Sequence, residues 1–196
     1  CLVGSEMCIR DSCEDLYHKY ENNMSLWGML ELIPFGRVAS LYLFCAKRFS
    51  KEKGMLDEAY MLRSCQKLRN AAAHNNCIFN ELRPRNRKQE PNRTVMQKLR
   101  LDSIRGYKRR MTNERMIHIV TLLFLYKQMI TSKGLLAHAT TKLHEFRLRM
   151  MQNSMYYEKN PMIKANLEFL NEVIEKWFPL LERENVPETL YSVGKS

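Results

Sequence analysis

The sequence predicts an all-α fold in which the helices pack as a bundle. Apolar residues recur at helical spacing along most of the 196-residue chain, which is the pattern of helices with one buried face. Glycine and proline are few, at 7 and 6 residues, whereas methionine, which favours helices, reaches 13. Residues suited to helix capping precede several of the periodic segments. A chain of this length can form one domain with a core, or a domain with an appendage.

The first helices are predicted from caps and breaks. Residues 13–33 are expected to form a helical arm interrupted at residues 22–23, with Ser25 as the N-cap of its second part. Trp27 and Leu30 mark the expected buried side of that part, before the Pro-Phe-Gly sequence that ends the helix. A helix over residues 37–49 follows. Its expected buried stripe consists of Val38, Leu41, Tyr42, Cys45 and Phe49.

A longer helix that ends near residue 73 is predicted next. Residues 50–54 are expected to form a charged turn, after which Asp57 can cap the helix. Asn75 and Asn76 are poor helix formers, so His74 is expected at or near the helix end. The expected inward face consists of Tyr60, Met61, Cys65, Leu68 and Ala72.

Residues 81–115 are strongly basic. They contain 12 Lys or Arg and 4 Asp or Glu, a net charge of +8. Prolines, asparagines and one glycine predict a long basic loop insertion around one short helix at residues 95–101. One interpretation is contact with the RNA backbone, with Tyr107 available for base stacking, and the other is a solvated loop. The candidate RNA-binding residues are Arg83, Arg85, Arg87, Lys88, Tyr107, Lys108, Arg109 and Arg110.

Three further helices are predicted towards the C-terminus. Asn113 starts the first, which is expected to end at residues 132–134. The second covers residues 137–157, and its histidines, His138 and His144, are expected to be solvated. Pro161 opens the third, which reaches residues 177–178. The predicted domains are residues 13–150, which form the main helical domain, and residues 151–196, which form a helical extension.

The first twelve residues resemble a translated sequencing adapter and are expected to be a non-native leader. They lack the basic n-region and long apolar h-region of a signal peptide, and they include the acidic Glu6. On this interpretation, residues 13–196 are the C-terminal fragment of a longer protein. The alternative is an ordinary N-terminal tail.

Charge and cysteine usage narrow the class of partner and the location. The chain has 32 Lys and Arg against 21 acidic residues, a net charge of +11, which favours nucleic acid first and an acidic membrane surface second. No apolar run approaches the length that spans a bilayer, so no membrane insertion is expected. The six cysteines form no C-x-x-C pair, which favours a cytoplasmic protein without a disulfide framework, and no metal or cofactor is expected.

The stretch from Arg69 to His74 carries the chemistry that we consider most informative. It places a permanent cation five residues before an imidazole that can exchange a proton near neutral pH. Asn70 lies four residues before His74 and therefore on the same helix face. These groups suffice for RNA cleavage without metal. The alternative is a chance pairing, because an Arg and a His at this spacing are common on helices.

Three segments resemble one family. Residues 26–42, LWGMLELIPFGRVASLY, resemble the tryptophan-containing helix and phenylalanine-glycine break of the Abi-like proteins, which are bacterial abortive-infection factors. Residues 68–80, LRNAAAHNNCIFN, resemble that family's arginine-asparagine-x-x-x-histidine signature, and residues 115–130 resemble its following apolar helix. The expected resemblance covers roughly residues 25–145.

The resemblance implies a HEPN-like helical bundle, because the family belongs to the HEPN superfamily. Members are typically metal-independent ribonucleases that act as homodimers with facing motifs, so it implies catalytic roles for Arg69, Asn70 and His74. The expected function is a toxin-like endoribonuclease in anti-phage defence, with RNA as substrate and a protein or RNA antitoxin as a further partner. The alternatives are a non-catalytic RNA-binding or regulatory module and a dimerisation scaffold.

Overall fold

The computed structural model describes residues 18, 25–49, 53–79, 82 and 90–180. Within these residues the secondary structure is helical and contains no strand, so the all-α prediction is confirmed. The chain divides into two compact units, Cys1–Asn76 and Cys77–Ser196, and each is described by itself. No helix in the described part of the chain has the length and apolar character needed to span a bilayer. The predicted leader, residues 1–12, lies outside the described residues.

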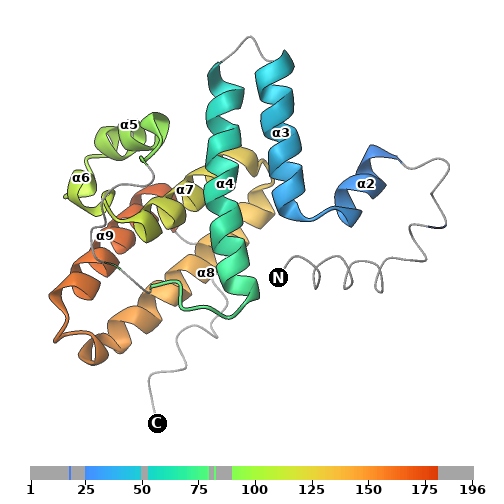
Figure 1. Cartoon of the computed structure of the whole chain (residues 1–196). Helices are drawn as coiled ribbons and strands as arrows, with labels where there is room; N and C mark the ends of the chain where they lie inside the picture. The colour runs from blue at the N-terminus through green and yellow to red at the C-terminus, as the bar shows by residue number, and fades with distance from the viewer. Residues whose placement is uncertain (1–17, 19–24, 50–52, 80–81, 83–89, 181–196) are drawn as a thin grey trace. The chain divides into compact units, whose positions relative to one another are not determined.

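The first unit contains α2 (Leu26–Leu32), α3 (Phe35–Phe49) and α4 (Lys53–Ala73) (Figure 1). As predicted, the Ser25 hydroxyl caps α2, where it accepts a hydrogen bond from the Gly28 N–H at 3.1 Å. The prediction that Trp27 is buried is wrong, because 79% of its surface is exposed. Spacing within a helix of two turns does not determine which side meets a neighbour.

Helices α3 and α4 form an antiparallel pair (Figure 1). Its core contains Ala39, Leu43, Ala46 and Ala59, and the three alanines let the helix backbones approach closely. The predicted stripe on α3 is therefore wrong in part, since Leu41 and Phe49 are exposed and the inward line runs through the small residues instead. The following residues are partly buried: Val38, Tyr42 and Cys45.

The N-terminal end of α4 differs from the prediction. The helix begins at Lys53, so Gly54 lies within it and Asp57 lies inside the helix rather than at its cap. Met61, Cys65 and Leu68 are buried as predicted, whereas Tyr60 is exposed and Ala71 replaces Ala72 on the buried face. The helix starts before Asp57 because Met55 and Leu56 pack against the core formed with α3.

In the second unit, α7 (Glu114–Met129) is buried on nearly all sides and provides the core. Helices α8 (Lys133–Gln152) and α9 (Pro161–Trp177) belong to the same unit, and a short 3-10 helix, Ser154–Tyr156, follows α8. The edge of the Phe124 ring meets the Trp177 ring at a centroid separation of 5.9 Å, which joins α7 to α9. The predicted boundaries at residues 12 and 150 stay predictions.

One predicted helix cap in this unit is confirmed, and two other predictions are wrong. Asn113 caps α7 and accepts a hydrogen bond from the Met116 N–H at 3.1 Å. Ser132 does not end α7 but caps α8, because its hydroxyl accepts a hydrogen bond from the Leu135 N–H. His144 is not solvated: it is buried, and its Nε2 lies 2.8 Å from the Phe178 carbonyl oxygen.

The basic segment is only partly a loop. Residues 93–110 include two short helices, α5 (Arg93–Leu101) and α6 (Tyr107–Arg110), where the sequence predicted one. The Asn92 side chain caps α5, and Val95 and Leu99 beneath it are fully buried. These two apolar residues, four positions apart on one helix face, therefore anchor part of the basic segment in the core of the second unit.

Candidate functional site

The end of α4 fixes the backbone at His74. Asn75 has a φ of 51°, in the left-handed region, and its N–H donates to the Ala72 carbonyl at 3.1 Å. The Asn76 N–H donates to the Ala71 carbonyl at 2.8 Å. These two hydrogen bonds form a Schellman cap, in which a left-handed residue satisfies the last carbonyls of the helix. His74 is the residue just before the left-handed one, as its predicted position at the helix end requires.

The three candidate catalytic side chains are all exposed at this end of α4. Arg69 Nη1 donates a hydrogen bond to Asn70 Oδ1 at 3.3 Å. Asn70 lies one turn before His74, and the His74 N–H donates to the Asn70 carbonyl at 3.0 Å. Asn70 therefore connects the cation to the helix face that carries the imidazole. Among the described residues, no hydrogen bond or ion pair engages the His74 side chain, so its ring nitrogens are available to a ligand.

The candidate RNA-binding residues fall into two sets. The first set, Arg83, Arg85, Arg87 and Lys88, lies outside the described residues. The second set forms α6 in the second unit, where Lys108 and Arg109 are exposed and Tyr107 and Arg110 are partly buried. The candidate catalytic residues belong to the first unit and this set to the second.

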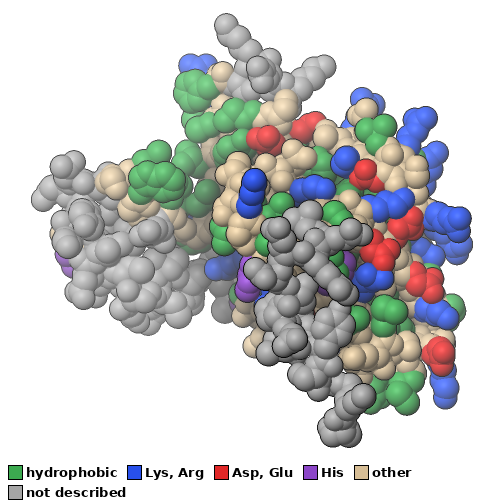
Figure 2. All heavy atoms as spheres, turned by 180° about the vertical axis from the view of Figure 1, so that it is seen from behind, with side chains coloured by type: hydrophobic (Ala, Val, Ile, Leu, Met, Phe, Trp, Pro, Cys, Tyr) green, Lys and Arg blue, Asp and Glu red, His purple; other side chains and the backbone are tan. Residues whose placement is uncertain are grey.

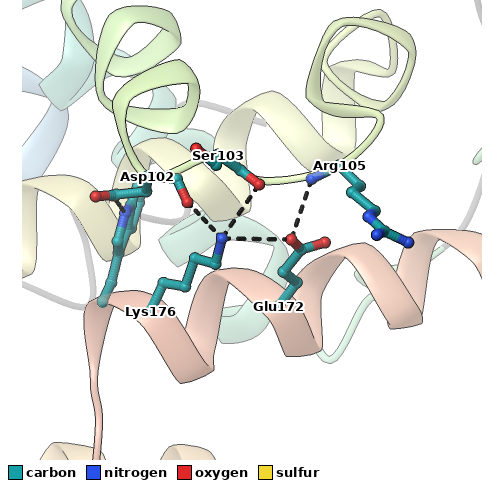
Figure 3. A network of polar contacts seen from close by, with 6 residues as sticks. Asp102, Ser103, Arg105, Glu172 and Lys176 are labelled. Atoms are coloured by element: carbon teal, nitrogen blue, oxygen red, sulfur yellow. Dashed lines mark hydrogen bonds and ion pairs between the residues drawn. The ribbon is translucent and has the colours of Figure 1, made fainter.

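Helix α9 holds the turn between α5 and α6 through a set of polar contacts that the sequence did not reveal (Figure 3). Lys176 donates hydrogen bonds to the carbonyls of Asp102 and Ser103, the latter at 3.1 Å. Glu172 Oε1 accepts a hydrogen bond from the Arg105 N–H at 3.1 Å. The indole N–H of Trp177 donates to the Asp102 carboxylate. We call Glu172, Lys176 and Trp177 the α9 anchor.

Basic side chains are concentrated on the side of the second unit where α5 and α6 lie. Figure 2 shows Lys and Arg side chains gathered there, with Asp and Glu side chains next to them. Arg93 and Arg100 are seven residues apart on α5, so they share one face, and both are exposed. That face lies opposite the buried Val95 and Leu99. These two arginines were not among the predicted RNA-binding residues, although their seven-residue spacing is visible in the sequence.

The first unit also carries the family signal. Residues 5–80 match the family model for Abi-like protein. This similarity confirms the predicted resemblance to that family, and we call residues 5–80 the Abi-like segment. The Abi-like segment contains both the tryptophan helix and the stretch from Arg69 to His74.

The bounds of the match differ from the expected ones. The Abi-like segment begins at residue 5, inside the predicted leader, and it ends at residue 80 rather than near residue 145. Helices α5 to α9 therefore lie outside it. No curated protein and no solved structure matches the chain.

Proposed function

We propose that this protein is an endoribonuclease of abortive-infection defence and cleaves RNA without a metal ion. The observation that supports this most directly is the exposed group of Arg69, Asn70 and His74 at the capped end of α4. That group lies inside the Abi-like segment, whose family name refers to abortive infection. The group supplies the two elements that RNA cleavage needs from a protein, which are a proton-transfer residue and a fixed cation.

In the proposed reaction, RNA provides its own nucleophile. His74 removes the proton from the 2′-hydroxyl, whose oxygen attacks the adjacent phosphorus. The P–O5′ bond breaks, and the leaving 5′-oxygen receives a proton from an acid. The products are a 2′,3′-cyclic phosphate and a 5′-hydroxyl. The reaction therefore requires proton transfers but no electron transfer and no external nucleophile.

Arg69 and Asn70 have supporting roles in this proposal. The Arg69 guanidinium neutralises the charge that accumulates on the phosphorane oxygens, and its planar set of donors suits two of them at once. Asn70 orients Arg69 through their hydrogen bond and lies on the same helix face as His74. In a homodimer with facing motifs, as the family resemblance implies, the second His74 supplies the acid. An antitoxin, either protein or RNA, is the expected further partner.

A cleavage assay with labelled RNA in excess chelator tests this proposal. The intact chain is compared with His74→Ala, and the product ends are mapped. We expect cyclic-phosphate ends from the intact chain and a loss of at least about 100-fold in rate from the variant. His138→Ala is the matched control, because His138 is also an exposed histidine at a helix surface. Equal cleavage by both variants, or complete inhibition by the chelator, would contradict the proposal.

A non-catalytic RNA-binding module is the second candidate function, and the exposed basic residues of α5 and α6 favour it. It predicts that His74→Ala leaves RNA binding intact while no cleavage occurs in the unmodified chain. The same assay therefore separates the two functions, provided that binding and cleavage are measured on the same RNA.

A further inference from the structure

We propose that α5 and α6 form a binding surface for the phosphate backbone of RNA that does not distinguish base sequence. The surface consists of five exposed basic residues: Arg93, Arg100, Arg105, Lys108 and Arg109. The proposal rests on the proposed function for its substrate class. It adds that binding does not depend on base sequence, and it assigns Arg93, Arg100 and Arg105, which were not among the predicted RNA-binding residues. We call these five residues the α5–α6 basic surface.

Two carboxylates beside this surface, Asp102 and Glu172, have partners of their own. Asp102 accepts the indole N–H of Trp177 and pairs with Lys98 at 3.3 Å. Glu172 binds the Arg105 main chain and lies 3.6 Å from Lys176 Nζ. Asp102 and Glu172 therefore bind groups other than the five cationic side chains, which are exposed to an outside partner. A cluster of exposed cations of this kind attracts a polyanion.

The α5–α6 basic surface is held in place before a partner binds. Arg105 lies in the turn whose carbonyls and amide are bound by the α9 anchor (Figure 3). Helix α5 is fixed from below by the fully buried Val95 and Leu99. Because the backbone that carries the cations is already ordered, binding does not incur the free-energy cost of ordering a loop.

The side chains present favour contacts to phosphate over contacts to bases. Tyr107 is the only aromatic residue in residues 90–115, and it is partly buried. Surfaces that hold single strands by their bases use several exposed aromatic rings, which are absent from this described stretch. The predicted stacking role of Tyr107 is therefore not part of this proposal.

A nucleic acid fits this surface better than an anionic membrane does. A helix that lies in a membrane interface needs a continuous apolar face to insert. The apolar face of α5 is already buried in the protein through Val95 and Leu99, and Leu101 is exposed only at its end. The cations of α5 are therefore not backed by an apolar face that could enter lipid.

The test is a binding titration that uses the full chain with His74→Ala, so that cleavage does not consume the ligand. Fluorescently labelled RNAs of twelve nucleotides, one oligo(U) and one of mixed sequence, are titrated between 50 and 300 mM salt. We expect dissociation constants within about threefold of each other and a log–log salt slope of about −3 for four or five phosphate contacts. A large preference for one sequence would overturn the proposal of backbone recognition.

The variants locate the surface. Arg100→Gln, Arg105→Gln, Lys108→Gln and Arg109→Gln together are expected to weaken binding at least 100-fold and to remove most of the salt slope. The matched control removes the same charge from exposed positions elsewhere in the second unit: Lys133→Gln, Arg149→Gln, Lys159→Gln and Lys164→Gln. Equal weakening by both sets would show that only net charge matters and would overturn the proposal.

Two further measurements show which proposal is wrong if the expected RNA binding is not observed. Vesicles of phosphatidylserine and phosphatidylcholine are titrated in parallel, and vesicle binding that the α5–α6 variants abolish while RNA binding persists would assign the surface to lipid. Cleavage by the chain without the His74 change is measured independently. Cleavage with unaltered binding by the α5–α6 variants would refute this inference alone, whereas binding without cleavage would refute only the proposed function.

Discussion

At the scale of single residues, Asn75 shapes the backbone at the helix end that carries the candidate catalytic group. Asn75 is in the left-handed conformation at φ 51°, and its position lets the Asn76 N–H reach the Ala71 carbonyl. Asparagine tolerates this conformation better than other residues with a Cβ, apart from aspartate. The backbone turn at Asn75 therefore fixes the backbone position from which the exposed His74 side chain extends.

Substitutions at Asn75 test whether the left-handed conformation of this residue positions His74. Asn75→Gly keeps the left-handed conformation, so we expect the unfolding free energy to change by no more than about 0.5 kcal/mol and cleavage to persist. Asn75→Val is expected to cost about 1–2 kcal/mol, because a β-branched residue is strained there, and to lower cleavage by displacing His74. Urea unfolding measures the change in unfolding free energy, and the cleavage assay measures the change in activity. Full activity in a destabilised Val variant would show that the cap does not position His74.

At the scale of secondary-structure elements, the sequence predicted what is local and missed what depends on distant partners. Ser25 and Asn113 were identified as caps because a cap and its helix lie within three residues of each other. The inward face of α3 was placed on large residues, whereas the α3–α4 contact is lined by alanines that periodicity does not mark as core. The partner of His144 is a carbonyl 34 residues away, which spacing cannot reveal.

The same distinction between local and distant contacts applies to the candidate functional residues. The Arg69–His74 stretch and its place at a helix end follow from residues that are adjacent in sequence. The α9 anchor joins residues about 70 positions apart, so no local sequence pattern predicts it. The charge of the basic segment and its helix near residues 95–101 were predicted from the sequence, whereas the contacts by which α9 holds the turn after that helix were not.

The α9 anchor makes a prediction about local opening of the turn between α5 and α6. In Glu172→Ala, the Arg105 amide loses its acceptor and is expected to exchange its hydrogen with solvent at least about tenfold faster. Glu168→Ala is the matched control, since Glu168 is an exposed glutamate one turn earlier on α9. Hydrogen exchange followed by mass spectrometry of peptides that cover residues 102–106 provides the measurement. Equal exchange in both variants would mean that Glu172 does not hold the turn.

At the scale of the whole molecule, the chain distributes its candidate functions between two compact units. The first unit carries the Abi-like match and the exposed Arg69, Asn70 and His74. The second carries the α5–α6 basic surface and lies outside the family match, apart from residues 77–80. The two proposals assign cleavage to the first unit and RNA binding to the second, so we expect cleavage and binding to be separable by substitution.

Alkaline pH is expected to destabilise the folded chain through two acids of the first unit, the buried Cys65 and the partly buried Tyr42. Burial raises the pKa of Cys65 from 9.0 to about 11. Burial, together with the hydrogen bond to Glu58, raises the pKa of Tyr42 from 10.0 to about 12. Both groups keep their proton longer in the folded state than in the unfolded state. The stabilisation is therefore complete below about pH 9 and is lost as the pH rises from 9 towards 12.

Cys65→Ala tests this linkage, because one pKa unit corresponds to about 1.4 kcal/mol, so the shift at Cys65 corresponds to roughly 3 kcal/mol in full and to roughly 2 kcal/mol by pH 11. The variant is expected to be less stable than the unmodified chain at pH 8, since it leaves a small cavity. The difference in unfolding free energy should shrink by roughly 2 kcal/mol between pH 8 and pH 11, because the unmodified chain alone must keep a buried thiol protonated. Urea unfolding under reducing conditions measures it, with Cys77→Ala as the control because that cysteine is exposed. If the unmodified chain and Cys65→Ala lost stability in parallel over this range, the Cys65 thiol would not be shielded from solvent in the folded state, and the α4 face that carries it would have to be more open than its burial indicates.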